Sequence, residues 1–157
     1  MRKFITLVFC LLFAANLFAQ NLANYTWDIA ELHFSAPQGL QVTEKSDTKL
    51  ALSNQNFSVV LEGVDNPSPG DDLKLYLVSL AKGYGLKQVS EADVTSVDLS
   101  GVVGLYVEGA LDNRNILGVE LLIDGDTGDS FTARLTYHPG GEKTATAVSQ
   151  SFYIHRQ

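Results

Sequence analysis

The chain has 157 residues, of which 45% are hydrophobic and 18% charged, and its formal net charge is −7 at neutral pH. This apolar content excludes a disordered chain, and a single cysteine excludes a disulfide scaffold. The acidic balance also argues against a nucleic-acid binder, because such proteins use clustered Lys and Arg to displace counterions from phosphates. We therefore expect one compact domain whose stability rests on packing.

The first 19 residues have the pattern of a secretory signal peptide. A basic pair at positions 2 and 3 precedes an apolar run over 4–13, and small residues follow up to Ala19. A membrane anchor would need about 20 unbroken apolar residues, whereas Asn16 interrupts this stretch. We predict cleavage after Ala19, a single domain over 20–157 exported to the periplasm or the extracellular space, and no integral membrane segment in the mature chain.

Cys10, the one cysteine, lies inside the predicted signal peptide. Phe9 precedes it where a lipid-attachment box needs Gly or Ala, so we expect no lipid anchor. The mature chain would then have no cysteine, which excludes thiol catalysis and Cys-ligated zinc. Cleavage would remove two of the eleven basic residues and none of the eighteen acidic ones, so the mature charge would be −9.

The first half of the mature chain predicts four strands and a helix. Alternating apolar residues indicate strands over 25–34, with a bulge near Ala30, and around 40–42, 50–52 and 57–61. At Ser68 the period becomes helical. Ser68 and Asp71 fit a capping box with Pro69 at the first helical position, so we predict a helix from Pro69 to Lys82 that buries Leu73, Leu77 and Leu80.

The second half predicts strand material over 88–99 and then a meander of three strands over 103–111, 117–123 and 131–137. The odd positions of all three are almost wholly apolar, so we expect them to share one face, with the helix packed on it. A closing helix is expected from about Glu142. Short turns between neighbouring strands make the predicted class α+β, an antiparallel sheet with helices packed on it.

The segment from Phe34 to Val42, FSAPQGLQV, resembles the Phe-x-x-Pro-x-Gly-Trp-x-Val entry of PsbP-like domains, with Leu40 where many members carry Trp. A mid-chain helix, the turn at 99–101 before the meander and the last helix ending in SFYI at 151–154 also resemble these domains. The resemblance implies an α-β-α sandwich and a non-catalytic binding or assembly role. It transfers no functional residue, because fold alone does not fix function.

No catalytic, metal-binding or nucleotide-binding motif appears in the sequence. His33, His138 and His155 lie on three separate segments without metal-ligand spacing, and neither a Gly-x-Ser-x-Gly elbow nor a phosphate loop occurs. The acidic turn over 124–129 matches an EF-hand loop at two ligands only, so a solvated hairpin turn is the better interpretation. We expect no catalytic residue, no metal and no cofactor.

The polar positions of the meander point to a candidate binding face. If the odd positions share a face, the hairpins place Glu108 opposite Glu120 and Glu120 opposite Arg134. One interpretation is an exposed salt-bridge row, in which each pair contributes about 0–1 kcal/mol. The other is a recognition groove for a partner.

Two classes of function remain open at this stage. The first is an exported, non-enzymatic binding or assembly module with an unknown protein partner or small ligand. The second is a carrier of a small apolar ligand between sheet and helix, which requires a cavity there. A small exported hydrolase is a third, weaker hypothesis.

Overall fold

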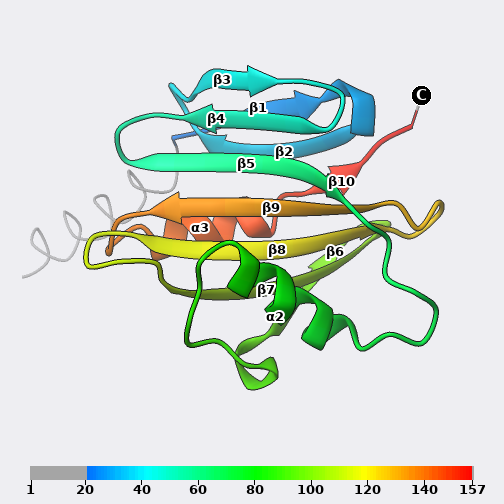
Figure 1. The fold of residues 1–157 in the computed structure, drawn as a ribbon. Coiled ribbons are helices and arrows are strands. Elements are labelled where there is room, and N and C mark those ends of the chain that lie inside the picture. The colour runs from blue at the N-terminus through cyan, green and yellow to red at the C-terminus, as the bar shows by residue number, and fades with distance from the viewer. Residues whose placement is uncertain (1–20, 157) are drawn as a thin grey trace, which may run out of the picture.

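The computed structural model describes residues 21–156 and shows an α+β fold with two antiparallel sheets, as the sequence predicts (Figure 1). The larger sheet has seven strands in the order β3-β4-β5-β9-β8-β7-β6. Their bounds are β3 Gln41–Lys45, β4 Lys49–Ser53, β5 Phe57–Val64, β6 Thr95–Leu99, β7 Val102–Ala110, β8 Ile116–Asp124 and β9 Ser130–Tyr137. The smaller sheet has the order β1-β2-β10, with β1 Leu22–Trp27, β2 Leu32–Pro37 and β10 Tyr153–Ile154.

The two faces of the large sheet are covered by different elements, and each cover encloses a hydrophobic core. The helix α2 (Leu73–Gly83) packs on β7 and β8 from one side, where Leu77, Val107 and Val119 are fully buried. The small sheet and α3 (Glu142–Ser149) cover the other face, where Phe34 and Val148 belong to the second core. Figure 1 shows α2 in front of the large sheet and α3 behind it.

The expected single bulged strand over 25–34 is in fact a hairpin. A 3-10 turn, η1 (Asp28–Ala30), separates β1 from β2, and Trp27 pairs with Leu32 across it. Glu31 adopts a left-handed conformation with φ of 51°, which reverses the chain within a few residues. The change of hydrophobic phase in this segment therefore marks a turn and not a bulge.

The predicted helix start at Pro69 is wrong by four residues. Asp72 is the N-cap, and its Oδ1 accepts hydrogen bonds from the backbone amides of Lys74 and Leu75 at 3.0 and 3.2 Å. Ser68 and Asp71 form a separate turn before it. Gly70, with φ of +89°, lies outside helical geometry and prevents the helix from starting earlier.

The strand expected over 88–99 is also shorter than predicted. A 3-10 turn, η2 (Glu91–Asp93), occupies its first part, and Ser90 and Asp93 form a capping box there. Only β6, from Thr95 to Leu99, joins the sheet, at its edge.

The third strand of the meander presents its apolar side to the opposite face from the one we expected. Three residues separate Leu111 from Asn115 in the β7–β8 turn, but four separate Asp124 from Asp129 in the β8–β9 turn. The extra residue pairs odd positions of β8 with even positions of β9, as in Val119 with Arg134. Leu135 consequently packs in the core on the α3 side and not beneath α2.

Candidate binding cleft

The structure separates the three residues of the predicted binding face. Glu120 pairs with Tyr106 and not with Glu108, which lies opposite Gly118 on the neighbouring row. Glu108 and Glu120 still share the face that α3 covers. Arg134 pairs with Val119 and therefore lies on the opposite, α2 face of the sheet. The predicted row of three is wrong for two reasons: the β7–β8 register is displaced by two residues, and the four-residue turn between β8 and β9 places Arg134 on the other face.

Arg134 has structural partners on the α2 face. Its guanidinium carbon lies 4.3 Å from the centre of the Tyr84 ring, a cation–π contact. Its Nη2 also donates to Glu62 Oε2 at 3.1 Å, from the neighbouring strand β5. These contacts tie the end of α2 to the sheet, and Arg134 is not part of the cleft described below.

On the α3 face, Glu108 is held by two tyrosines from different strands. The hydroxyls of Tyr106 and Tyr137 both donate to Glu108 Oε2, at 2.8 and 2.6 Å. Gly118 of β8 lies beneath this network. A Cβ at position 118 would stand 2.1 Å from the Tyr106 hydroxyl oxygen, so only glycine leaves room for the Tyr106 ring to lie over β8 here.

The two tyrosine hydroxyls are hydrogen-bond donors that resist ionisation. Burial, followed by the hydrogen bond to Glu108, raises the pKa of Tyr106 far above its ordinary value of 10.0. The same causes, in the same order, raise the pKa of Tyr137. Both side chains therefore stay neutral at physiological pH and fix the orientation of the Glu108 carboxylate.

Glu120 is the most unusual polar residue of this face. It has no exposed surface, and neither of its carboxylate oxygens accepts a hydrogen bond from the residues that the structure describes. Burial raises its pKa well above the ordinary 4.5 and outweighs the nearby Ser149 hydroxyl of α3, which acts in the opposite direction. A buried carboxyl without a hydrogen-bond partner is costly, so its presence in a core calls for a functional explanation.

A cleft of about 670 Å³ opens between α3 and the strands β6 and β7. Its walls include Tyr106 and Glu108 on β7 and Ser149 on α3. Tyr106 and Ser149 are also the neighbours of Glu120, so the buried carboxyl lies directly behind the cleft wall. The remaining lining residues are Thr95, Ser96, Val97, Asp98, Thr146 and Gln150.

Sequence reasoning selected Glu108 and Glu120 but missed the tyrosines and Gly118. Tyr106 stands at an even position between the odd apolar residues of β7, where an aromatic residue on a polar face was a usable signal. Tyr137 was assigned to a core by its odd position, and it does belong to one. Its hydroxyl nevertheless reaches Glu108, which only the register of three strands reveals.

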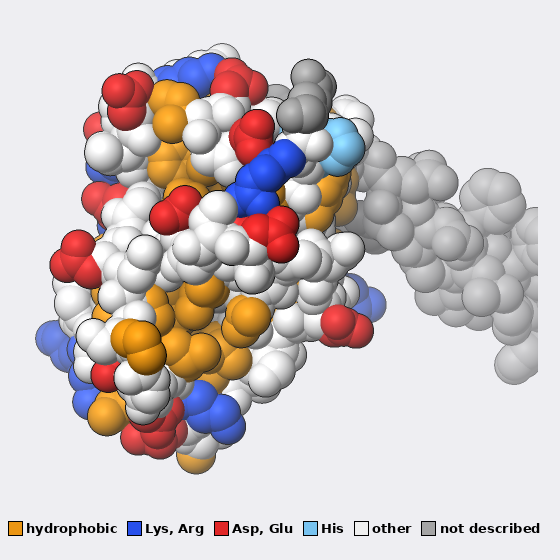
Figure 2. Space-filling view, turned by 90° about the vertical axis from the view of Figure 1, so that its right-hand side faces the viewer, with side chains coloured by type: hydrophobic (Ala, Val, Ile, Leu, Met, Phe, Trp, Pro, Cys, Tyr) orange, Lys and Arg blue, Asp and Glu red, His pale blue; other side chains and the backbone are white. Residues whose placement is uncertain are grey.

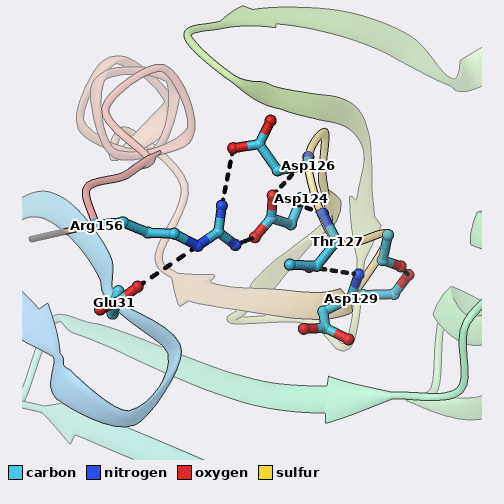
Figure 3. Close-up of polar contacts among 8 residues, drawn as sticks. Glu31, Asp124, Asp126, Thr127, Asp129 and Arg156 are labelled. Atoms are coloured by element: carbon cyan, nitrogen blue, oxygen red, sulfur yellow. Dashed lines mark hydrogen bonds and ion pairs between the residues drawn. The ribbon is translucent and has the colours of Figure 1, made fainter.

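The acidic turn after β8 is organised by an arginine near the C-terminus (Figure 3). Asp124 Oδ1 accepts the backbone amide of Asp126 at 2.8 Å, and Asp124 Oδ2 pairs with Arg156. Arg156 also contacts Asp126 Oδ2 at 2.9 Å and Glu31 Oε2 at 3.7 Å. The turn is thus a hairpin closed by an ion-pair cluster. Figure 2 views this end of the molecule and shows basic and acidic side chains side by side above hydrophobic ones.

Asp124 ionises more readily than an ordinary aspartate. Its burial favours the neutral acid, but backbone amides of Asp126 and Thr127 and the Arg156 guanidinium outweigh burial and lower the pKa of Asp124. Arg156 therefore ties the C-terminal segment to the large sheet through a charged group.

Two of the three histidines meet in space although the sequence separates them. The rings of His33 and His155 have centroids 6.2 Å apart, and Tyr153 stacks on His33 at 4.9 Å. His138 lies elsewhere, with Nδ1 3.1 Å from the carbonyl oxygen of Arg114. Across residues 21–156, no three His, Cys, Asp or Glu side chains are grouped so that they could hold a metal ion.

No helix within the described residues is long and apolar enough to span a bilayer. No family model and no curated protein matches the chain.

Solved structures reveal the fold relationship. The crystal structure of the Ran-binding protein Mog1p from Saccharomyces cerevisiae aligns with a TM-score of 0.59 at 11% identity, over 85% of this chain and 95% of that one. A point mutant of Mog1 gives 0.60 at 11% identity, over 86% and 96%. The solution structure of cyanobacterial PsbP from Synechocystis sp. PCC 6803 gives 0.56 at 13% identity, over 86% and 93%.

These alignments confirm the PsbP-like resemblance at the level of the fold. The chain is an α+β protein with the architecture that cyanobacterial PsbP and Mog1 share. Identities of 11–13% carry no residue roles from those proteins to this chain.

Proposed function

We propose that this protein is a non-enzymatic binding module, exported from the cytoplasm, and that the cleft between α3 and strands β6 and β7 is its binding site. The observation that carries the proposal is Glu120, fully buried and without a hydrogen-bond partner among the described residues, directly behind the cleft wall. Natural cores rarely retain such a group without a use for it. One structural neighbour is a Ran-binding protein, which is consistent with a binding role for this fold.

The packing beneath α2 favours this function over an apolar-ligand carrier. Leu77 of α2 and the strand residues Val107, Val119 and Leu121 have no exposed surface and fill the layer between helix and sheet. A carrier would need that volume for its ligand. The polar cleft on the other face is therefore the better candidate.

Affinity capture from the exported fraction tests the binding role. Three purified baits are compared: the wild type, Glu108→Gln in the cleft, and Glu91→Gln as the matched control. Glu91 is exposed on η2, which contacts α2 and so lies away from the cleft. We expect a partner or ligand that the wild type and Glu91→Gln retain and Glu108→Gln loses. Equal retention by all three baits would place the binding site elsewhere.

N-terminal sequencing of the exported protein tests its destination. We expect the mature chain to begin at Gln20 and to carry no lipid. A fatty-acylated Cys10, or an uncleaved chain found in the cytoplasm, would refute the export argument.

A further inference from the structure

The cleft has the charge pattern of a cation receptor. Glu108 directs its carboxylate to the cleft face, whereas the lining residue Asp98 pairs with Val103 and so directs its side chain to the α2 face. None of the lining residues is Lys or Arg. Glu120 adds a second carboxyl behind the wall. The acidic formal charge of the whole chain also raises the local concentration of cations near such a cleft.

The network around Glu108 leaves one carboxylate oxygen for a ligand. Both tyrosine hydroxyls donate to Oε2, so the carboxylate is held by a single oxygen. Within the described part of the chain no hydrogen bond reaches Oε1. A carboxylate fixed in this way is preorganised to accept a hydrogen bond from a positively charged N–H donor, and such charge-assisted hydrogen bonds are stronger than neutral ones.

We propose that the cleft binds an organic cation, an alkylammonium or guanidinium group, with Glu108 as its direct acceptor and Glu120 as a second carboxyl behind it. This inference rests on the cleft being the binding site of the proposed function. An ammonium group fits better than a metal ion, because the described residues offer no group of three ligating side chains here. Tyr106 and Ser149 supply hydroxyl oxygens that can accept the remaining N–H groups.

Glu120 couples cation binding to a proton. Tyr106 of β7 and Ala133 of β9 lie opposite it on the two neighbouring strands, and Ser149 of α3 is close to it; none of these is cationic. Its burial favours the neutral acid in the free protein. A cation entering the cleft favours the charged form, so binding releases a proton from Glu120.

Titrations followed by amide NMR test the recognition step. The probes are cadaverine, as a free diamine, and Nα-acetyl-lysine amide, as a lysine side chain of a protein partner; 1-pentanol is the neutral control. We expect one or both cations to shift amides of the cleft walls and 1-pentanol to shift none. Tighter binding of cadaverine identifies a free amine as the source, and tighter binding of the lysine amide identifies a partner protein.

Two variants separate the roles of the carboxyls. Glu108→Gln should weaken cation binding about tenfold or more, because a hydrogen bond between two charged groups is lost. Glu120→Gln should abolish the proton release, measured by calorimetry in two buffers of different ionisation enthalpy, and should weaken binding less than Glu108→Gln does, because Glu120 acts on the cation only through its charge. Glu91→Gln should match the wild type in both.

The inference is overturned if neither cation binds, if 1-pentanol produces the same shifts, or if Glu108→Gln binds as tightly as the wild type. These outcomes differ from a failure of the proposed function. Capture that depends on Glu108, with no binding of either cation, would leave the binding module intact and refute the cationic ligand alone.

Discussion

Replacing Glu120 provides the sharpest test of the structure, because this residue is predicted to lower the stability of the fold. Leaving a buried polar group without partners costs about 1–3 kcal/mol, and both carboxylate oxygens of Glu120 are in this state among the described residues. Glu120→Leu keeps a similar volume and removes both oxygens. We therefore expect the free energy of unfolding to rise by about 1–3 kcal/mol.

The pH dependence distinguishes the charge of Glu120 from its polarity. The pKa of Glu120 lies well above 4.5 in the folded chain, because burial disfavours the carboxylate. Its contribution is therefore most favourable below the unfolded pKa and declines as the pH rises toward the folded pKa. Glu120→Gln, which cannot ionise, should match the wild type below 4.5 and become progressively more stable than it toward neutral pH.

Urea unfolding at acidic and at neutral pH measures both effects. The single tryptophan, Trp27, is buried in the core on the α3 side and reports unfolding by its fluorescence. The exposed control Glu91→Gln should change stability by less than about 0.5 kcal/mol. If Glu120→Leu unfolds at lower urea concentrations than the wild type at both pH values, the carboxyl stabilises the fold and this reasoning is refuted.

Three further predictions concern packing, the tyrosine network and the ion-pair cluster. Leu77→Ala should cost about 2–5 kcal/mol, because Leu77 has no exposed surface, whereas Lys74→Ala on the exposed side of α2 should cost less than about 0.5 kcal/mol; equal melting temperatures would contradict the placement of α2. Gly118→Ala should displace the Tyr106 ring, since the new Cβ would meet its hydroxyl at 2.1 Å, and lower stability by about 1–3 kcal/mol; unchanged ring resonances in NMR spectra would refute it. Arg156→Gln should lower the melting temperature at neutral pH, because Arg156 pairs with the ionised carboxylate of Asp124. This contribution is fully present above 3.8, the ordinary pKa of an aspartate, and is lost as the pH falls through the lowered pKa of Asp124. A difference that persists in strong acid would show a cause other than the ion pair.

The elements that could be predicted from the sequence are those with a local period. The alternation in β7 and β8 and the stripe on α2 follow from residues a few positions apart, and Leu77 is buried as its spacing predicts. The predicted β7–β8 pairing assigned the residues of both strands to the correct faces, but its register was displaced by two residues, because Tyr106 and not Glu108 lies opposite Glu120. Local patterns state which side of a strand is apolar, but they do not specify its partner.

The α2 start shows a different limit of local reasoning. Ser68 and Asp71 satisfy the spacing of a capping box, yet Asp72 is the cap. Both acidic residues can accept backbone amides, and the left-handed conformation of Gly70 decides between them. Sequence permits that conformation without requiring it.

One extra residue in the turn after β8 decided which side chains of β9 lie on the same face as Glu108 and Glu120. The sequence alone predicted an acidic α+β chain, most of its strands, its main helix and two residues of the candidate site, Glu108 and Glu120, because composition and periodicity are properties of neighbouring residues. Only the tertiary structure decided that the four-residue turn after β8 turns Arg134 to the other face, and that α3 buries Glu120. The physical reason is that a one-residue shift in strand register moves every side chain of the strand to the other face of the sheet. Burial then depends on which element covers each face, and local periodicity does not encode that choice.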